Sequence, residues 1–198
     1  MDAERRMIYT SRELRVEDGD GGPVLTGYSA VFNSDSVPLW GFIEQIAPGA
    51  FARALREKQD VRALVDHDPA RIIGRTTSGT LKLTEDSTGL LATIMPPDTQ
   101  VGRDIVTSVR RGDVSGQSFA FAVRKDEWTF ADDGPDRRRI LDVDLYDVGP
   151  VTYPAYPATS IDARSAEQAV AAYKSARRRW ELDRKRRIFR LTSLSAGA

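Results

Sequence analysis

Residues 118–124 read SFAFAVR, and their large apolar side chains recur at every second position. This period of two is typical of a β-strand that buries one face in a core. Similar short apolar segments, separated by turn-forming residues, recur along much of the chain. We therefore expect a mainly β protein with some helix, an α+β fold, and a closed or nearly closed barrel rather than a parallel α/β sheet. The predicted strands are 7–17, 24–32, 42–46, 61–65, 80–83, 89–95 and 118–124, with one or two more over 139–143 and 145–151.

Three segments carry helical signals. The first spans about residues 48–58. The second has apolar side chains at four-residue spacing, follows Asp98, a good N-cap, and stops at Gly112, where a C-cap glycine belongs. The third begins with the capping-box pattern of Ser165–Gln168 and should continue to about Arg190.

The composition is that of an ordinary globular protein, with 40% hydrophobic and 29% charged residues among 198, enough for one substantial core. The absence of cysteine excludes disulfides, a thiolate nucleophile and a cysteine-based zinc site. No apolar run approaches the roughly 20 residues of a membrane span. The opening MDAERRMIYTSREL (1–14) lacks the apolar core of a secretory signal. We therefore expect a cytoplasmic protein without a membrane partner.

A net charge of zero conceals a strongly basic segment near the end of the chain. Residues 174–190 contain nine lysines and arginines and two acidic residues, a net charge of +7, so the rest of the chain carries −7. An acidic body and a basic tail suggest two parts with different roles. We place the boundary between residues 1–162 and a helical extension at 163–198.

The only histidine, His67, lies in LVDHDP (64–69), at the end of a predicted strand. Its position after a strand and before Pro69 suits a rigidly held side chain. An imidazole, with an unperturbed pKa of about 6.5, also suits general-base work near neutral pH. The alternatives are a purely structural histidine and a metal site with Asp66 and Asp68, which no further ligand cluster supports.

Ser118, in VSGQSFAF (114–121), is the candidate nucleophile that His67 would activate. The surrounding letters approach the G-x-S-x-G elbow of α/β-hydrolases, but that elbow needs a strand before the serine and a helix after it, and here the order is reversed. Ser118 could also simply begin a strand, and Ser115 is a nearby competitor. Asp147, in an otherwise apolar segment, is the candidate group that orients the imidazole, because a carboxylate there needs a partner.

Taken together, these motifs resemble the prohead proteases of HK97-like tailed bacteriophages. The matching strings, in order over residues 8–162, are GYSAVFNS (27–34), FIEQIAPGAFARAL (42–55), DHDPARIIGR (66–75), VSGQSFAFAV (114–123) and LYDVGPVTYPAYPAT (145–159). The resemblance implies a serine endopeptidase related in fold to the herpesvirus maturation protease, an antiparallel barrel with flanking helices. His67 matches the family histidine, Ser118 the family serine, and Asp147 a position where the family more often has glutamate.

Three residues depart from the family pattern. Gln117 and Ala120, which flank the matched serine, replace the usual methionine and glycine, and Gly149 replaces the usual serine. The first two could alter the geometry of the strand or the donors of an oxyanion site.

The resemblance also implies the biological setting. The expected substrates are the scaffold segment, the major capsid protein and the protease itself, inside the immature capsid in the host cytoplasm. No cofactor or metal is expected, and self-association is left open. The basic tail could dock on acidic scaffold or capsid surfaces or be removed by self-cleavage, and nucleic acid is a less favoured partner. The main alternative is a non-catalytic capsid-assembly or scaffold component, including a degenerate protease used for binding.

Overall fold

The computed structural model describes residues 4–7, 14–36, 38–39, 41–152 and 163–195, which form ten strands, three α-helices and one 3-10 turn. The helices are α1 (Ala52–Arg56), α2 (Gln100–Arg111) and α3 (Ala163–Ser195), and the 3-10 turn is η1 (Val65–His67). The strands are β1 (Glu4–Met7), β2 (Arg15–Gly19), β3 (Gly22–Val31), β4 (Phe42–Ile46), β5 (Arg62–Leu64), β6 (Ile72–Arg75), β7 (Leu81–Glu85), β8 (Gly89–Ile94), β9 (Gly116–Thr129) and β10 (Asp136–Val151).

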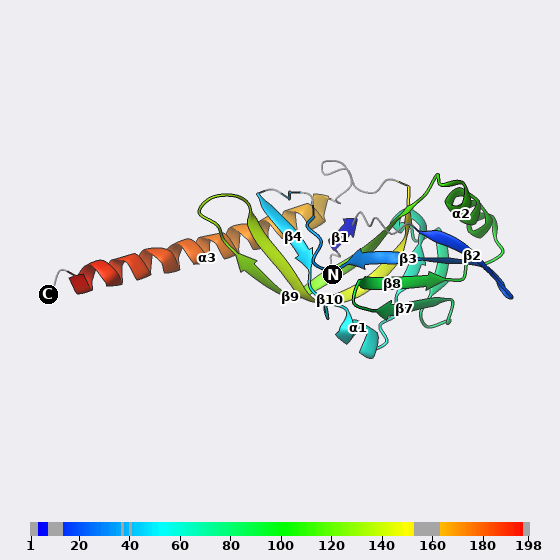
Figure 1. Cartoon of the computed structure of the whole chain (residues 1–198), viewed down its shortest axis with the longest axis horizontal. Coiled ribbons are helices and arrows are strands. Elements are labelled where there is room, and N and C mark those ends of the chain that lie inside the picture. Colours follow the sequence, from blue (N-terminus) through cyan, green and yellow to red (C-terminus); the bar gives the residue numbers. More distant parts are fainter. Residues whose placement is uncertain (1–3, 8–13, 37, 40, 153–162, 196–198) are drawn as a thin grey trace.

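The strands form two sheets, and β9 and β10 are the longest of them (Figure 1). The six-stranded sheet has the order β1-β9-β10-β5-β6, with β4 also paired to β10, and the four-stranded sheet has the order β2-β3-β8-β7. The α+β class is thus confirmed. The predicted closed barrel is not, because the described strands make two separate sheets and β10 pairs in parallel with β4 and β5. Alternating apolar residues bury one face of a strand in a barrel and in a two-sheet packing alike, so the pattern cannot separate them.

The core lies between the two sheets. Phe119 and Phe121 of β9 stack at 4.8 Å between ring centroids, and Phe51 meets Phe119 edge-on at 5.6 Å. All three are fully buried and belong to one cluster with apolar residues of β3 and β8, such as Leu25 and Ile94. The strand that the alternation in SFAFAVR predicts is thus confirmed, with the phenylalanines in the core. Ser118 and Ala120 consequently point to the other face of the sheet.

Several local predictions differ in detail from the structure. The strand expected at 7–17 is represented by β1 and β2, and residues 8–13 between them lie outside the described part. The N-cap of α2 is Thr99, whose Oγ1 accepts the N–H of Gly102 at 3.3 Å. Asp98 lies one residue earlier and pairs with Arg103. Gly112 caps the other end with a φ of 80°, as expected. The segment expected as one or two strands at 139–151 is part of one long strand, β10.

The helix α3 packs against the β9–β10 hairpin and then extends away from it (Figure 1). Tyr173 packs between Phe42 and Trp128 and donates a hydrogen bond to the buried Asp136 at 2.9 Å. Arg177 donates to the same carboxylate at 2.7 and 2.8 Å. The helix starts within two residues of the expected capping box. The proline-rich segment 153–157 lies outside the described residues, and the boundary at 162 stays a prediction.

Beside α1, Asp144 of β10 holds together three segments. Its carboxylate accepts hydrogen bonds from Arg53 at 2.7 Å, Gln59 at 3.0 Å and Arg124 at 2.5 Å. Burial raises the pKa of this carboxyl group, but the hydrogen bonds from Arg124, Arg53 and Gln59 outweigh burial and hold the pKa at about 2. Because an unfolded aspartate has a pKa of about 3.9, folding favours the ionised form.

We predict that Asp144→Asn lowers the free energy of unfolding at pH 7 by about 1–2 kcal/mol, measured by urea denaturation. The depressed pKa makes this stabilisation fully present above about pH 4 and progressively lost as the pH falls toward 2. The difference in the free energy of unfolding between wild type and Asp144→Asn should therefore be smaller at pH 3 than at pH 7. Asp133→Asn, at an exposed turn position, is the control. An equal loss at both pH values would contradict this account.

Candidate active site

Two neighbouring strands place the predicted serine and carboxylate on the same face of the six-stranded sheet. Ser118 is the third residue of β9 and is directly opposite Gly149 of β10, while Asp147 is opposite Ala120. Residues directly opposite each other in an antiparallel pair point to the same side. Ser118 and Asp147 thus share a face, two residues apart along the ladder.

A third strand brings His67 to that face. β5 pairs in parallel with β10, with Arg62 beside Asp147, and the chain turns immediately afterwards through η1. His67 Nδ1 lies 2.5 Å from Asp147 Oδ1, and His67 Nε2 lies 2.7 Å from Ser118 Oγ. A carboxylate only accepts hydrogen bonds, so Nδ1 carries the proton and Nε2 is left to accept one from the serine hydroxyl.

The three side chains are well shielded from solvent. Ser118 has no exposed surface, and the side chains of His67 and Asp147 are 10% and 11% exposed. Hydrogen bonds that involve a charged group are stronger in such surroundings than in water. The site therefore holds an imidazole in one tautomer against an enclosed hydroxyl. Chemically, this arrangement can remove a proton from the serine oxygen as that oxygen attacks an electrophile.

The carboxylates on either side of His67 bind elsewhere. Asp68 Oδ1 accepts the N–H of Ala70 at 2.9 Å, and Asp66 bonds to Thr152 and Arg71. The backbone here is not extended, because Asp66 and His67 both have left-handed φ angles, 54° and 57°. Within the described ranges, no group of three or more acidic or histidine side chains is arranged to hold a metal ion.

Gly149 is needed for the close approach of β5 to β10. A Cβ atom built on this residue would lie 2.0 Å from the carbonyl oxygen of Leu64 and 2.9 Å from its carbonyl carbon. These are backbone atoms that cannot swing aside, so any side chain here would push away the segment that leads into η1. The departure from serine that the sequence shows at this position is thus a requirement of this packing.

Gln117, the other unusual neighbour of Ser118, faces the four-stranded sheet. It is buried and accepts a hydrogen bond from Ser29 Oγ of β3 at 2.7 Å, and its Nε2 has no hydrogen-bond partner within the described part. That nitrogen would lie 2.6 Å from a Cβ at Gly27. Gln117 therefore ties the strand of Ser118 to the second sheet from behind. Sequence reasoning missed this contact, because nothing in the chain links residues 88 positions apart.

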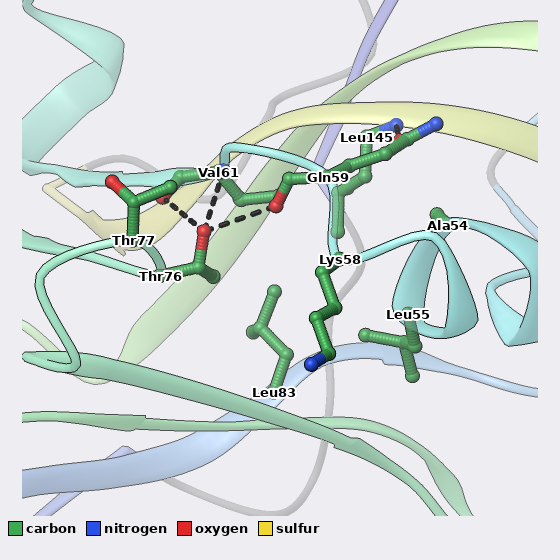
Figure 2. Close-up of a pocket in the computed structure, with 9 residues that line it drawn as sticks. All are labelled: Ala54, Leu55, Lys58, Gln59, Val61, Thr76, Thr77, Leu83 and Leu145. Atoms are coloured by element: carbon green, nitrogen blue, oxygen red, sulfur yellow. Dashed lines mark hydrogen bonds between the residues drawn. The ribbon is translucent and has the colours of Figure 1, made fainter.

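A pocket of about 450 Å³ opens between α1, the start of β5 and β7, and none of the three predicted site residues lines it (Figure 2). Its walls include Leu55, Leu83 and Leu145. Thr76 Oγ1 accepts the N–H of Val61 at 2.9 Å and donates to the carbonyl of Gln59 at 3.0 Å. The pocket is separate from the candidate site, because His67, Ser118 and Asp147 do not line it.

Fold and site together define a mixed α+β protein with the side-chain arrangement of a serine hydrolase. The family model of the caudovirus prohead serine protease matches residues 10–174, so the chain belongs to this family of capsid maturation proteases. Family membership confirms the resemblance of the sequence motifs.

One solved structure, the bacteriophage T4 capsid assembly protease gp21, is similar to this chain at a TM-score of 0.45 and 14% identity. The similarity covers 75% of this chain and 98% of that chain. No curated protein matches.

We predict that Gly149→Ala destabilises the protein by at least about 2 kcal/mol, because the methyl group collides with backbone atoms of Leu64. Urea denaturation measures this loss. The control is Gly21→Ala, since a Cβ at Gly21 would meet nothing within 4 Å. Equal stability of the two variants would show that β5 does not pack this closely on β10.

Proposed function

We propose that this chain is a serine endopeptidase in which Ser118 is the nucleophile, His67 the general base and Asp147 the group that orients the imidazole. The observation that carries the proposal is the bridge made by one imidazole, which bonds to Asp147 through Nδ1 and to Ser118 through Nε2. The roles are those of the serine–histidine–aspartate triad, which recurs on unrelated folds.

The reaction follows acyl transfer. His67 Nε2 takes the hydroxyl proton while Ser118 Oγ forms a bond to the peptide carbonyl carbon. Backbone N–H groups near Ser118, or from a neighbouring loop, stabilise the oxyanion. The C–N bond then breaks as His67 returns the proton to the leaving amine, which gives an acyl-enzyme. Water repeats the two steps and releases the acid. Asp147 orients the imidazole and stabilises the imidazolium that forms in each step.

The enclosure of Ser118 affects how the enzyme would meet its substrate. Because the residue has no exposed surface, a peptide carbonyl reaches the hydroxyl only after neighbouring atoms move. Inside a closed shell, substrate and enzyme share a small volume, and the high effective concentration compensates for slow encounter or weak affinity.

The family setting suggests the substrates. We infer that the chain cleaves the major capsid protein, a scaffold segment and itself within the immature capsid. Residues 1–162 would form the protease unit. Residues 163–198 would form a basic extension that docks on acidic surfaces of the scaffold or capsid. Among the described residues, no helix has the length and apolar character to cross a membrane.

We predict that Ser118→Ala and His67→Ala each lower cleavage of a co-expressed scaffold–capsid fusion by a factor of about 10⁴, because each removes a member of the triad. Asp147→Asn should cause a loss of similar size by favouring the wrong tautomer. Cleavage is measured on gels, and each variant is checked by circular dichroism. Ser115→Ala is the control, since Ser115 is exposed and its hydrogen bond to another described residue is made by its backbone carbonyl, which accepts the N–H of Leu14.

Purified wild-type protein incubated alone should shorten with time, and a fluorophosphonate should label Ser118. Cleavage retained in the folded Ser118→Ala or His67→Ala protein would refute the assignment. A wild-type chain that stays intact and unlabelled, and leaves the fusion uncleaved, would instead favour the non-catalytic alternative.

A further inference from the structure

The segment that presents His67 has a costly backbone conformation. Asp66 and His67 are consecutive non-glycine residues with φ of 54° and 57°. The left-handed region is unfavourable for an ordinary residue because Cβ comes too close to the following carbonyl oxygen, and it is less unfavourable for aspartate, whose short polar side chain can hydrogen-bond locally. Such a conformation persists only where the surroundings determine it. The contacts of this turn are therefore what fix the position of the imidazole.

The carboxylate of Asp66 connects the turn to the residue that follows β10. Its Oδ1 accepts the backbone N–H of Thr152 at 2.7 Å, and its Oδ2 accepts the Thr152 hydroxyl at 3.1 Å. Arg71 Nη1 donates to Oδ2 at 3.0 Å. Thr152 immediately follows β10, which makes Asp66 a clamp between the turn and that strand.

Two residues of β10 and the residue that follows it thus hold the segment 64–67. The Cα of Gly149 packs against the carbonyl of Leu64, the Asp147 carboxylate binds the imidazole, and Thr152 binds Asp66. The first restrains the entry to the turn and the second restrains the ring itself. Only the third restrains the backbone of the residue that directly precedes His67.

We propose that Asp66 is a positioning residue, which holds the left-handed turn on the end of β10 and so sets the distance from His67 to Ser118. This role rests on the proposed function of His67. Asp66 does not contact the reacting groups, and its side chain is 34% exposed, so its removal leaves the fold standing. Displacing a general base by about 1 Å can cost on the order of 100-fold in rate.

Three variants at this position separate the clamp from the backbone preference. Asp66→Asn keeps an oxygen for the Thr152 N–H and tolerates a left-handed φ, so it should keep the rate of fluorophosphonate labelling within about 3-fold of wild type. Asp66→Gly relieves the backbone but has no acceptor. Asp66→Ala has neither advantage. Both should label about 10–100-fold more slowly, with unchanged circular dichroism.

The outcomes are decisive in both directions. Wild-type labelling by Asp66→Gly would show that the residue serves only the backbone conformation and would overturn the clamp. An Asp66→Asn protein that is labelled as slowly as Asp66→Ala would also overturn the clamp, since the hydrogen bond from the Thr152 N–H would then have no effect on the labelling rate. Failure of the proposed function is separate: in that case the wild type itself is not labelled at Ser118.

A second readout does not need catalysis. His67 is the only histidine in the chain, so its ring signals in a nuclear magnetic resonance spectrum need no assignment. In a Ser118→Ala background, which cannot cleave itself, the proton on His67 Nδ1, which is hydrogen-bonded to Asp147, should give one downfield resonance. Asp66→Ala should shift or broaden that resonance, and Asp66→Asn should restore it. A resonance indifferent to Asp66→Ala would overturn the positioning role whatever the enzyme does.

Discussion

At Asp147, β10 is paired with β9 along one edge and with β5 along the other, and the site depends on this double pairing. The antiparallel edge puts Ser118 on the same face as Asp147. The parallel edge delivers the chain to the start of η1 at the same level. A shift of either pairing by one residue would turn the corresponding side chains to the opposite face of the sheet. Register, rather than any single contact, is what assembles the three groups.

Next to β10, the site combines a close approach of two backbones with a turn of strained backbone conformation. Gly149 removes a side chain so that the Leu64 carbonyl can approach, and the chain then bends at once through two left-handed residues. A turn of this kind re-aims a side chain within a few residues, which a regular strand cannot do because its side chains alternate strictly. Behind the site, Gln117 fixes β9 to the second sheet. Rigid strands therefore carry the serine and the carboxylate, and a strained turn carries the imidazole.

The sequence predicted the residue types of this site better than its geometry. A lone histidine, a serine in an alternating strand and a carboxylate in an apolar segment could each be picked out by chemistry and by family resemblance. Ser118 and Asp147 lie 51 and 80 residues from His67 in the chain, and a contact over such a separation cannot be recognised in a single sequence. The predicted barrel is not confirmed, and the sequence could not have settled this point, because alternating apolar residues fit a barrel and a two-sheet packing equally well. The contact of Asp66 with Thr152 was missed because it depends on a left-handed turn that nothing in the sequence indicates.

The sequence gives only the net charge of the basic tail, whereas the structure shows which of its basic residues form ion pairs within the molecule. Arg177 and Arg184 of α3 form ion pairs with Asp136 and Asp132 of the β9–β10 hairpin, so part of the +7 is neutralised within the molecule. Five other basic residues of the helix have no acidic partner among the residues that the structure describes, and all five are exposed: Lys174, Arg178, Arg179, Lys185 and Arg187. The segment of α3 that contains Tyr173, Arg177 and Arg184 thus uses aromatic packing and charge to attach the helix, and the unneutralised charge is what an acidic partner would meet. Docking on acidic surfaces therefore needs no rearrangement of the contacts that anchor the helix to the body.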